Sequence, residues 1–108
     1  MAELLSRGEI YICAFGSPDN QRPVVIITLD PFIAYSNSLL VGPITSTIRG
    51  VAITVLLAGD DGMKHPCAVN LLQTACVPKD RLGQIVTRLS LKKVLGLCTA
   101  LRVAIGCD

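Results

Sequence analysis

A mainly β fold is the architecture that the sequence predicts: a small antiparallel β-barrel followed by one C-terminal helix. Short runs rich in Val, Ile and Thr recur along most of the chain, and turn-forming residues separate them. That pattern is typical of short strands. The last segment differs, because its apolar residues recur at the spacing of a helix face. Many short strands ahead of a terminal helix favour a barrel with the helix packed against it.

The first expected strand covers residues 8–15 and has apolar residues on both of its faces. The second covers 22–30, and Pro23 stands near its start, where a missing N–H matters least. Turn-forming residues at 16–21 separate these two strands. Four more strands are expected at 38–44, 51–57, 67–73 and 82–89, with a polar loop at 58–66.

The terminal helix is expected to begin after Ser90, a good N-cap residue, and to stop at Gly106. Its apolar face is predicted to consist of Leu91, Val94, Leu95, Cys98, Leu101 and Ile105. Its polar side is predicted to carry Lys92, Lys93, Thr99 and Arg102.

The composition predicts one globular domain over residues 1–108 and argues against disorder. Hydrophobic residues make up 51% of the 108 positions and charged residues only 17%, whereas disordered chains are poor in apolar residues and rich in charge. The apolar runs are far shorter than the ~20 residues of a spanning helix, and the N-terminus, with Glu3, does not resemble a secretory signal. We therefore expect a cytoplasmic protein with no membrane segment. Its excess of apolar surface predicts pairing with a second copy or another partner.

The cysteines predict free thiols in a reducing compartment. They are odd in number, and no pair has the C-x-x-C spacing of a zinc or redox site: Cys13, Cys67, Cys76, Cys98 and Cys107. The only histidine, His65, cannot complete a convincing ligand set. We therefore expect no metal and no cofactor, and we interpret His65 as a plain loop residue.

The stretch PITSTIRG, residues 43–50, is the most unusual polar feature of the sequence. Directly after an apolar run it gathers hydroxyl groups and a cation in Thr45, Ser46, Thr47 and Arg49. Arg22 stands at the start of the second expected strand. If that strand pairs with the third in a meander, two guanidinium groups and three hydroxyls lie near one barrel edge. Such a set of donors can hold a phosphate.

Few reactions can run on arginine and hydroxyl groups alone, and the sequence offers no glycine-rich nucleotide loop or nucleophile elbow. RNA cleavage by the RNA's own 2′-hydroxyl suits such a site, because the nucleophile is already attached to the substrate. The protein then holds the in-line geometry and stabilises charge on phosphorus. On the residues alone, two blander interpretations stay open: a solvated strand-edge Arg22, and hydroxyls that serve an ordinary turn.

Four segments, in this order, resemble the MazF/PemK family of toxin endoribonucleases: RGEIYICAFGSP, RPVVIITLD, VGPITSTIRG and RLGQIVTRLS. The resemblance runs from Arg7 to about Gly106. It implies the small Src-homology-type barrel of the CcdB/PemK/MazF toxins, assembled as a homodimer. It further implies metal-independent, sequence-specific cleavage of single-stranded RNA, which leaves 2′,3′-cyclic phosphate and 5′-hydroxyl ends. A MazE-like antitoxin is the implied protein partner.

The resemblance also implies roles for single residues. Arg22 matches the catalytic arginine of the family's RP motif, and Thr45 matches the catalytic threonine after PI. Ser46 and Thr47 follow in the same loop as implied phosphate contacts, and Arg49 falls in the stretch that helps to choose bases.

Departures from the family pattern concern the surface that selects RNA sequence. Gln73 matches a glutamine that lines the RNA channel of the family, but Leu72 precedes it in place of an acid, and Ala75 and Cys76 follow it in place of an Arg-Thr pair. Asp19 is the only acid available to replace the glutamate that several relatives carry before the arginine. We carry over the reaction and not the recognition sequence.

Two rival functions follow from the same resemblance. The first is a non-catalytic binder like the CcdB toxins, which act on DNA gyrase. The second is a degenerate homologue that binds an antitoxin but no longer cuts RNA. The presence of both Arg22 and Thr45 argues against the first rival, and the changes around Gln73 leave the second open.

Overall fold

The computed structural model describes residues 5–15, 20–48 and 50–107, and in them it contains seven strands and a long C-terminal helix. The strands are β1 (Glu9–Ala14), β2 (Gln21–Ile26), β3 (Ser38–Thr45), β4 (Thr54–Leu57), β5 (Cys67–Asn70), β6 (Ala75–Pro78) and β7 (Leu82–Arg88). The helices are α1 (Asp30–Ile33) and α2 (Leu91–Ile105), and three short 3₁₀ turns are η1 (Gly59–Asp61), η2 (Leu71–Gln73) and η3 (Lys79–Arg81). The predicted mainly β fold with a C-terminal helix is confirmed.

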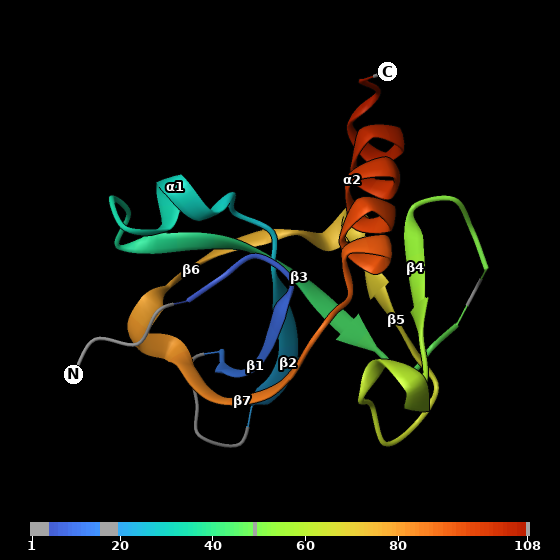
Figure 1. Ribbon diagram of the computed structural model, residues 1–108, viewed down its shortest axis with the longest axis horizontal. Helices are drawn as coiled ribbons and strands as arrows, with labels where there is room; N and C mark the ends of the chain where they lie inside the picture. The colour runs from blue at the N-terminus through green and yellow to red at the C-terminus, as the bar shows by residue number, and fades with distance from the viewer. Residues whose placement is uncertain (1–4, 16–19, 49, 108) are drawn as a thin grey trace.

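The strands form a partly closed barrel and a second, smaller sheet that share β3 (Figure 1). The barrel side has the order β6-β3-β2-β1-β7, and all pairs in it are antiparallel. The C-terminal end of β3 leaves the barrel and pairs with β5, which pairs with the edge strand β4. The end of β3, where Thr45 lies, is therefore the junction of the two parts.

Two apolar cores lie on the two faces of the shared strands, because successive residues of a strand point to opposite sides. Tyr11, Val24 and Val41 belong to the core inside the barrel. Ile10 and Val25 belong to the other core, which also contains residues of β5 and α2. This explains why both faces of residues 8–15 are apolar in the sequence.

Three of the expected strands are wrong in part. The strand expected at 51–57 begins only at Thr54. The strand expected at 67–73 ends at Asn70, whose side chain accepts a hydrogen bond from the backbone N–H of Leu72 at 3.0 Å and so starts the turn η2. The chain then re-enters the sheet as β6, which pairs with β3 and which the sequence pattern did not predict. The second expected strand ends at Ile26 instead of residue 30.

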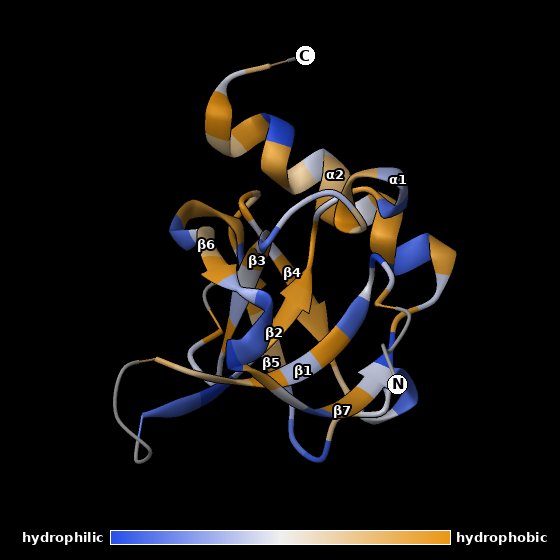
Figure 2. Cartoon of the chain, turned by 90° about the vertical axis from the view of Figure 1, so that its left-hand side faces the viewer, coloured by the Kyte–Doolittle hydropathy of each residue, from blue (hydrophilic) through white to orange (hydrophobic). Residues whose placement is uncertain are grey.

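The capping residues of α2 are as predicted, but the buried face of this helix is rotated. Ser90 Oγ accepts a hydrogen bond from the N–H of Lys93 at 3.3 Å, and Gly106 ends the helix with φ +74°. The buried residues are Val94, Leu97 and Ala100. Three residues of the predicted apolar face are exposed, namely Leu91, Leu95 and Ile105, at 72%, 57% and 63%. Much of α2 is apolar (Figure 2), so the sequence pattern alone could not choose the side that packs against β4 and η2.

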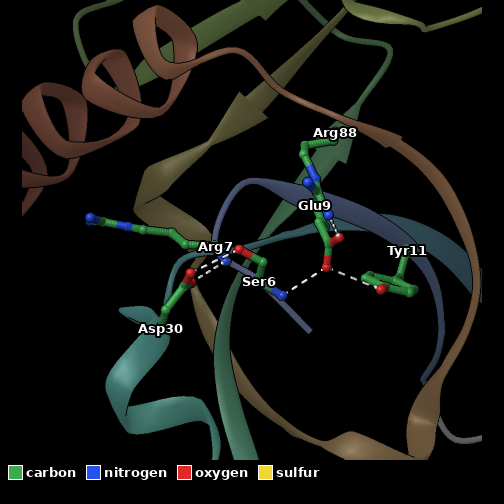
Figure 3. Close-up of polar contacts among 6 residues, drawn as sticks. All are labelled: Ser6, Arg7, Glu9, Tyr11, Asp30 and Arg88. Carbon is green, nitrogen blue, oxygen red and sulfur yellow. Dashed lines mark hydrogen bonds and ion pairs between the residues drawn. The ribbon is translucent and has the colours of Figure 1, made fainter. Parts of the chain in front are cut away.

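The RGEIY segment has a structural role that explains its residue types (Figure 3). Glu9 is 2% exposed. Its carboxylate accepts hydrogen bonds from the N–H of Ser6 at 2.7 Å and the hydroxyl of Tyr11 at 3.1 Å, and pairs with Arg88 at 2.5 Å. Gly8 has φ +90°, and a Cβ there would lie 2.6 Å from Val94 Cγ2. The segment therefore ties β1 to β7 and lets the chain approach α2 closely.

A second carboxylate extends this network to the start of α1. Asp30 accepts hydrogen bonds from the N–H of Arg7 at 2.7 Å and the hydroxyl of Ser6 at 2.9 Å. These bonds hold the pKa of Asp30 below its ordinary value, the backbone bond contributing most. Glu9, through its hydrogen bond and then its charge, raises the pKa of the Arg88 guanidinium.

Candidate functional site

A groove of about 530 Å³ opens at the junction of the barrel and the second sheet. One wall comes from β1, β2 and β7, and the other from the loop between η1 and β5. The end of β3 closes the groove between them. Its lining residues are Ile12, Pro23, Ile44, Thr45, Ser46, Gly62, Met63, Lys64, His65, Pro66, Cys67 and Val86.

Thr45 is held in the groove by the strand pairing at the end of β3. It is the last residue of β3 and lies opposite Ala68 of β5. Its Oγ1 accepts a hydrogen bond from the backbone N–H of Thr47 at 3.1 Å. Because a hydroxyl can accept this bond and still donate its own hydrogen, Thr45 can offer an O–H to an anion.

Arg22 lies beside this site on the neighbouring strand. In the antiparallel register of β2 and β3, Val24 is opposite Pro43, and this is the last pair of the two strands. Arg22 and Thr45 each lie two residues beyond it, where the end of β3 pairs with β5.

Arg22 is exposed, and among the described residues it makes no hydrogen bond or ion pair. Its neighbour Pro23 lines the groove, but Arg22 itself is not among the described lining residues. An exposed guanidinium without a partner among the described residues can bind an anion without first losing a protein contact.

The loop that carries Lys64 and His65 is anchored at several points. Asp61 Oδ2 accepts a hydrogen bond from the N–H of Ala58 at 2.9 Å and lies 3.7 Å from Lys93 Nζ. Lys93 also donates to the carbonyl of Leu56 at 2.6 Å. Gly62 has φ +90° and packs so closely on Thr87 that a Cβ would lie 2.8 Å from Thr87 Cβ. These contacts place the loop against β7, opposite the end of β3.

Lys64 and His65 are groove residues that sequence reasoning missed. The interpretation of His65 as a plain loop residue did not foresee that it shares the groove with Thr45 and Ser46. The spacing in the sequence carries no signal for this, because the contact that seats the loop joins Gly62 to Thr87, far away along the chain.

The remaining predicted site residues are spread over different places. Ser46 lines the groove and is exposed, while Thr47 is exposed just beyond it. Gln73 is exposed and lies in η2. This turn follows the C-terminal end of β5, whereas the N-terminal end of β5 lines the groove. Asp19 and Arg49 lie outside the described residues.

The groove has a neutral thiol and a cationic rim. Burial raises the pKa of the Cys67 thiol above its ordinary value, and the Asp61 carboxylate raises it further. Because the thiolate is the nucleophilic form of cysteine, Cys67 is not poised as a nucleophile. Lys64 contributes a positive charge from the loop, and the exposed Arg22 contributes another on the nearby end of β2. The arrangement suits a ligand with phosphate groups.

Metal chemistry and membrane insertion find no support in the described residues. No three His, Cys, Asp or Glu side chains gather there as a possible metal-ligand set. Nor does any helix in the same residues have the length and apolar character needed to cross a membrane.

Comparison with known proteins gives a consistent set of relatives. Residues 6–105 match the family of PemK-like, MazF-like toxins of type II toxin–antitoxin systems. The chain is 37% identical, over 100% of its own length and 99% of the relative's, to a probable endoribonuclease MazF5 of Mycobacterium tuberculosis.

Solved structures agree with these matches. The Mycobacterium tuberculosis toxin MazF-mt6 superposes with a TM-score of 0.83 at 29% identity, covering 93% of this chain and 98% of the other. An endoribonuclease from a mycobacterial species, solved with its cognate antitoxin, gives 0.85 at 22% identity, covering 96% and 97%.

Proposed function

The chain belongs to the PemK-like, MazF-like toxins of type II toxin–antitoxin systems, and from this premise we propose that it is an endoribonuclease. Its substrate is single-stranded RNA, which it cleaves at a short sequence motif. Attack by the 2′-hydroxyl on the adjacent phosphorus leaves a 2′,3′-cyclic phosphate and a 5′-hydroxyl. No metal ion takes part, because cationic side chains supply the positive charge that the phosphate needs.

One observation supports this proposal: Thr45 lines a groove together with Lys64 and His65, and Arg22 lies on the neighbouring strand, two residues beyond its last pair with β3. A guanidinium fork matches two phosphate oxygens at once. Arg22 also makes no hydrogen bond or ion pair among the described residues. An exposed arginine without such a partner suits phosphate binding better than it suits fold stability.

The reaction requires three things of the protein: alignment, charge stabilisation and movement of two protons. The 2′-oxygen loses its proton as it bonds to phosphorus, and the 5′-oxygen gains a proton as its bond to phosphorus breaks. Arg22 stabilises the extra negative charge and moves neither proton, since arginine stays protonated in proteins. Thr45 donates its O–H to a phosphate oxygen and orients the phosphate.

His65 is the groove residue that best complements this pair. An imidazole can both accept and donate a proton, whereas Arg22 cannot serve as the base. We assign His65 to proton transfer and Lys64 to a phosphate contact. Ser46 and Thr47 supply further hydroxyl donors. Arg49, Gln73 and Asp19 remain proposed contacts to RNA on the family resemblance alone.

The biological setting follows from the family. The partner is a MazE-like antitoxin that blocks the RNA site, and the protein acts in the cytoplasm, where its substrate is made. We treat residues 1–108 as one toxin domain, in line with the match over residues 6–105. We also propose a homodimer, which would cover part of the exposed apolar surface of α2.

The test is cleavage of a long single-stranded RNA by purified protein in excess EDTA. Arg22→Ala should abolish cleavage and leave the melting temperature unchanged, because an exposed charge contributes little to the fold. Thr45→Ala should slow cleavage about 10² to 10³-fold, as expected for one transition-state donor. Arg22→Ala that cuts as well as wild type would refute the site assignment.

Intact RNA with well-folded wild-type protein would favour one of the two rivals. A gyrase-binding toxin should inhibit supercoiling of DNA, whereas a degenerate homologue should only bind its antitoxin. No feature of the groove favours either rival over RNA cleavage.

A further inference from the structure

A second hollow, of about 380 Å³, lies next to the groove on the same strands. It is lined by Ile12, Ala14, Gln21, Asp80, Arg81, Leu82, Gly83 and Gln84. The strands β1, β2 and β7 and the turn η3 all contribute to it. We refer to this hollow as the bulge pocket.

A β-bulge shapes this pocket. Tyr11 lies opposite Ile85 and Cys13 lies opposite Leu82. Ile12 alone therefore faces two residues of β7, which are Gly83 and Gln84. A bulge of this kind bends the strand and redirects its side chains, and bulges are frequent beside active sites.

Glycine at position 83 allows the bulged strand to approach β1. A Cβ on Gly83 would lie 3.2 Å from the backbone oxygen of Ile12, which is tighter than side chains usually tolerate. In a regular ladder Ile12 would have a single partner on β7. Because of the bulge it has no such partner, and Gln84 lines the pocket at this place.

Four polar side chains in the pocket make no side-chain hydrogen bond to any residue that the structure describes. Gln21, Asp80, Arg81 and Gln84 are all exposed, and none of them makes a hydrogen bond within the described part of the chain. Two amides supply both donors and acceptors, the carboxylate supplies acceptors, and the guanidinium supplies donors. A phosphate would require donors only, whereas the edge of a nucleobase presents both kinds of group.

The bulge pocket also lies next to the groove that is proposed to hold the scissile phosphate. Ile12 lines both the groove and the bulge pocket, so the two hollows adjoin. Thr45 lines the groove on the other side of Ile12. A nucleotide chain whose phosphate sits at Thr45 therefore has the bulge pocket beside it.

We propose that the bulge pocket binds a nucleobase that flanks the scissile phosphate and so determines part of the cleavage motif. This inference rests on the proposed endoribonuclease function. Gln84 and Arg81 read the edge of the base, Asp80 accepts from its amino or imino groups, and Ile12 supports it from the side of the groove.

The experiment compares the cut sites of variants on one RNA pool with randomised positions. The 5′-hydroxyl ends are sequenced after cleavage by wild type, Gln84→Ala, Arg81→Ala and Lys79→Ala. Lys79 is the matched control for Arg81, because it also lies in η3 and carries the same charge but does not line the pocket. Thermal melts of all four proteins show whether the fold is retained.

The expected result is a change in preference at one motif position. Gln84→Ala and Arg81→Ala should lose about 10 to 100-fold of discrimination there, the scale of one well-formed base contact, and still cut RNA. Lys79→Ala should keep the wild-type motif.

Two results would overturn the inference. In the first, wild type cuts RNA and both pocket variants keep an unchanged motif. In the second, Arg81→Ala weakens cleavage uniformly at all sites to the same extent as Lys79→Ala, which is the behaviour of a phosphate contact. A wild-type protein that cuts no RNA would instead refute the proposed function, and this inference with it.

Discussion

Substitution of Gly62 tests how far the groove depends on the loop that faces Thr45. Gly62 has φ +90°, and an added Cβ would lie 2.8 Å from Thr87 Cβ and closer still to Thr87 Oγ1. Alanine at this φ costs about 1 to 2 kcal/mol from backbone strain alone. Ordinary contact begins near 3.4 Å, so the loop must also retreat from β7 by roughly 0.6 Å or more.

This retreat should affect cleavage more than it affects stability. The loop carries Lys64 and His65 into the groove, and both are exposed, whereas only Met63 of the loop packs against the core. A displacement of about 1 Å in a catalytic site can cost about 10²-fold in rate. We therefore expect Gly62→Ala to cut RNA at least about tenfold more slowly than wild type, and to lose about 1 to 3 kcal/mol of unfolding free energy.

Gly106→Ala is the control that separates backbone strain from steric overlap. Gly106 has φ +74°, but a Cβ there would meet nothing within 4 Å. This variant should lose about 1 to 2 kcal/mol and cut at the wild-type rate. The assays are initial rates on a single-stranded RNA and urea unfolding followed by circular dichroism. If Gly62→Ala cuts as fast as Gly106→Ala, the loop does not set the geometry of the groove.

Three further predictions concern the fold and its ionisable groups. Glu9→Gln should cost about 1 to 3 kcal/mol in urea unfolding, because an amide retains only one acceptor oxygen for the donors that surround the buried carboxylate; wild-type stability would contradict the network in Figure 3. The lowered pKa of Asp30 means that its contribution is present at neutral pH and is lost as the pH falls through and below the ordinary value of 3.8, so Asp30→Asn should be less stable than wild type at pH 7 and the gap should close on acidification. Finally, an alkylating reagent should label the exposed Cys76 far faster at pH 7.5 than the buried Cys67, whose pKa is raised; equal rates, read by mass spectrometry of peptides, would show that the groove wall opens.

Local patterns predicted most of the fold, because most strands here carry their own signals. Residues 8–15 alternate two apolar faces since both faces of β1 are buried, and Ser90 and Gly106 cap α2 through local bonds. The sequence did not predict elements whose formation depends on contacts between residues far apart in the chain. β6 is short and ends at Pro78, and it is a strand only because β3 supplies an unpaired edge.

The position of Thr45 could be predicted from the sequence, whereas that of His65 could not. Arg22 and Thr45 stand near strand ends, where polar residues beside apolar runs are conspicuous, and their role in a common site stays a prediction. His65 carries no such signal, because the seating of its loop on Thr87 involves residues far apart in the chain. The bulge pocket was missed as well, because a bulge depends on the register between β1 and β7.

The strand that completes the barrel is also one of the last to be synthesised. Thr87 seats the loop and Val86 lines the groove, and both belong to β7, which pairs with β1 at the start of the chain. At ~5 to 20 residues per second of synthesis, a nascent chain carries Arg22 and Thr45 for some seconds before β7 exists. During that time the part of the groove wall that β7 supplies is absent. The order of the strands along the chain thus delays the assembly of the groove until nearly all of the protein has been made.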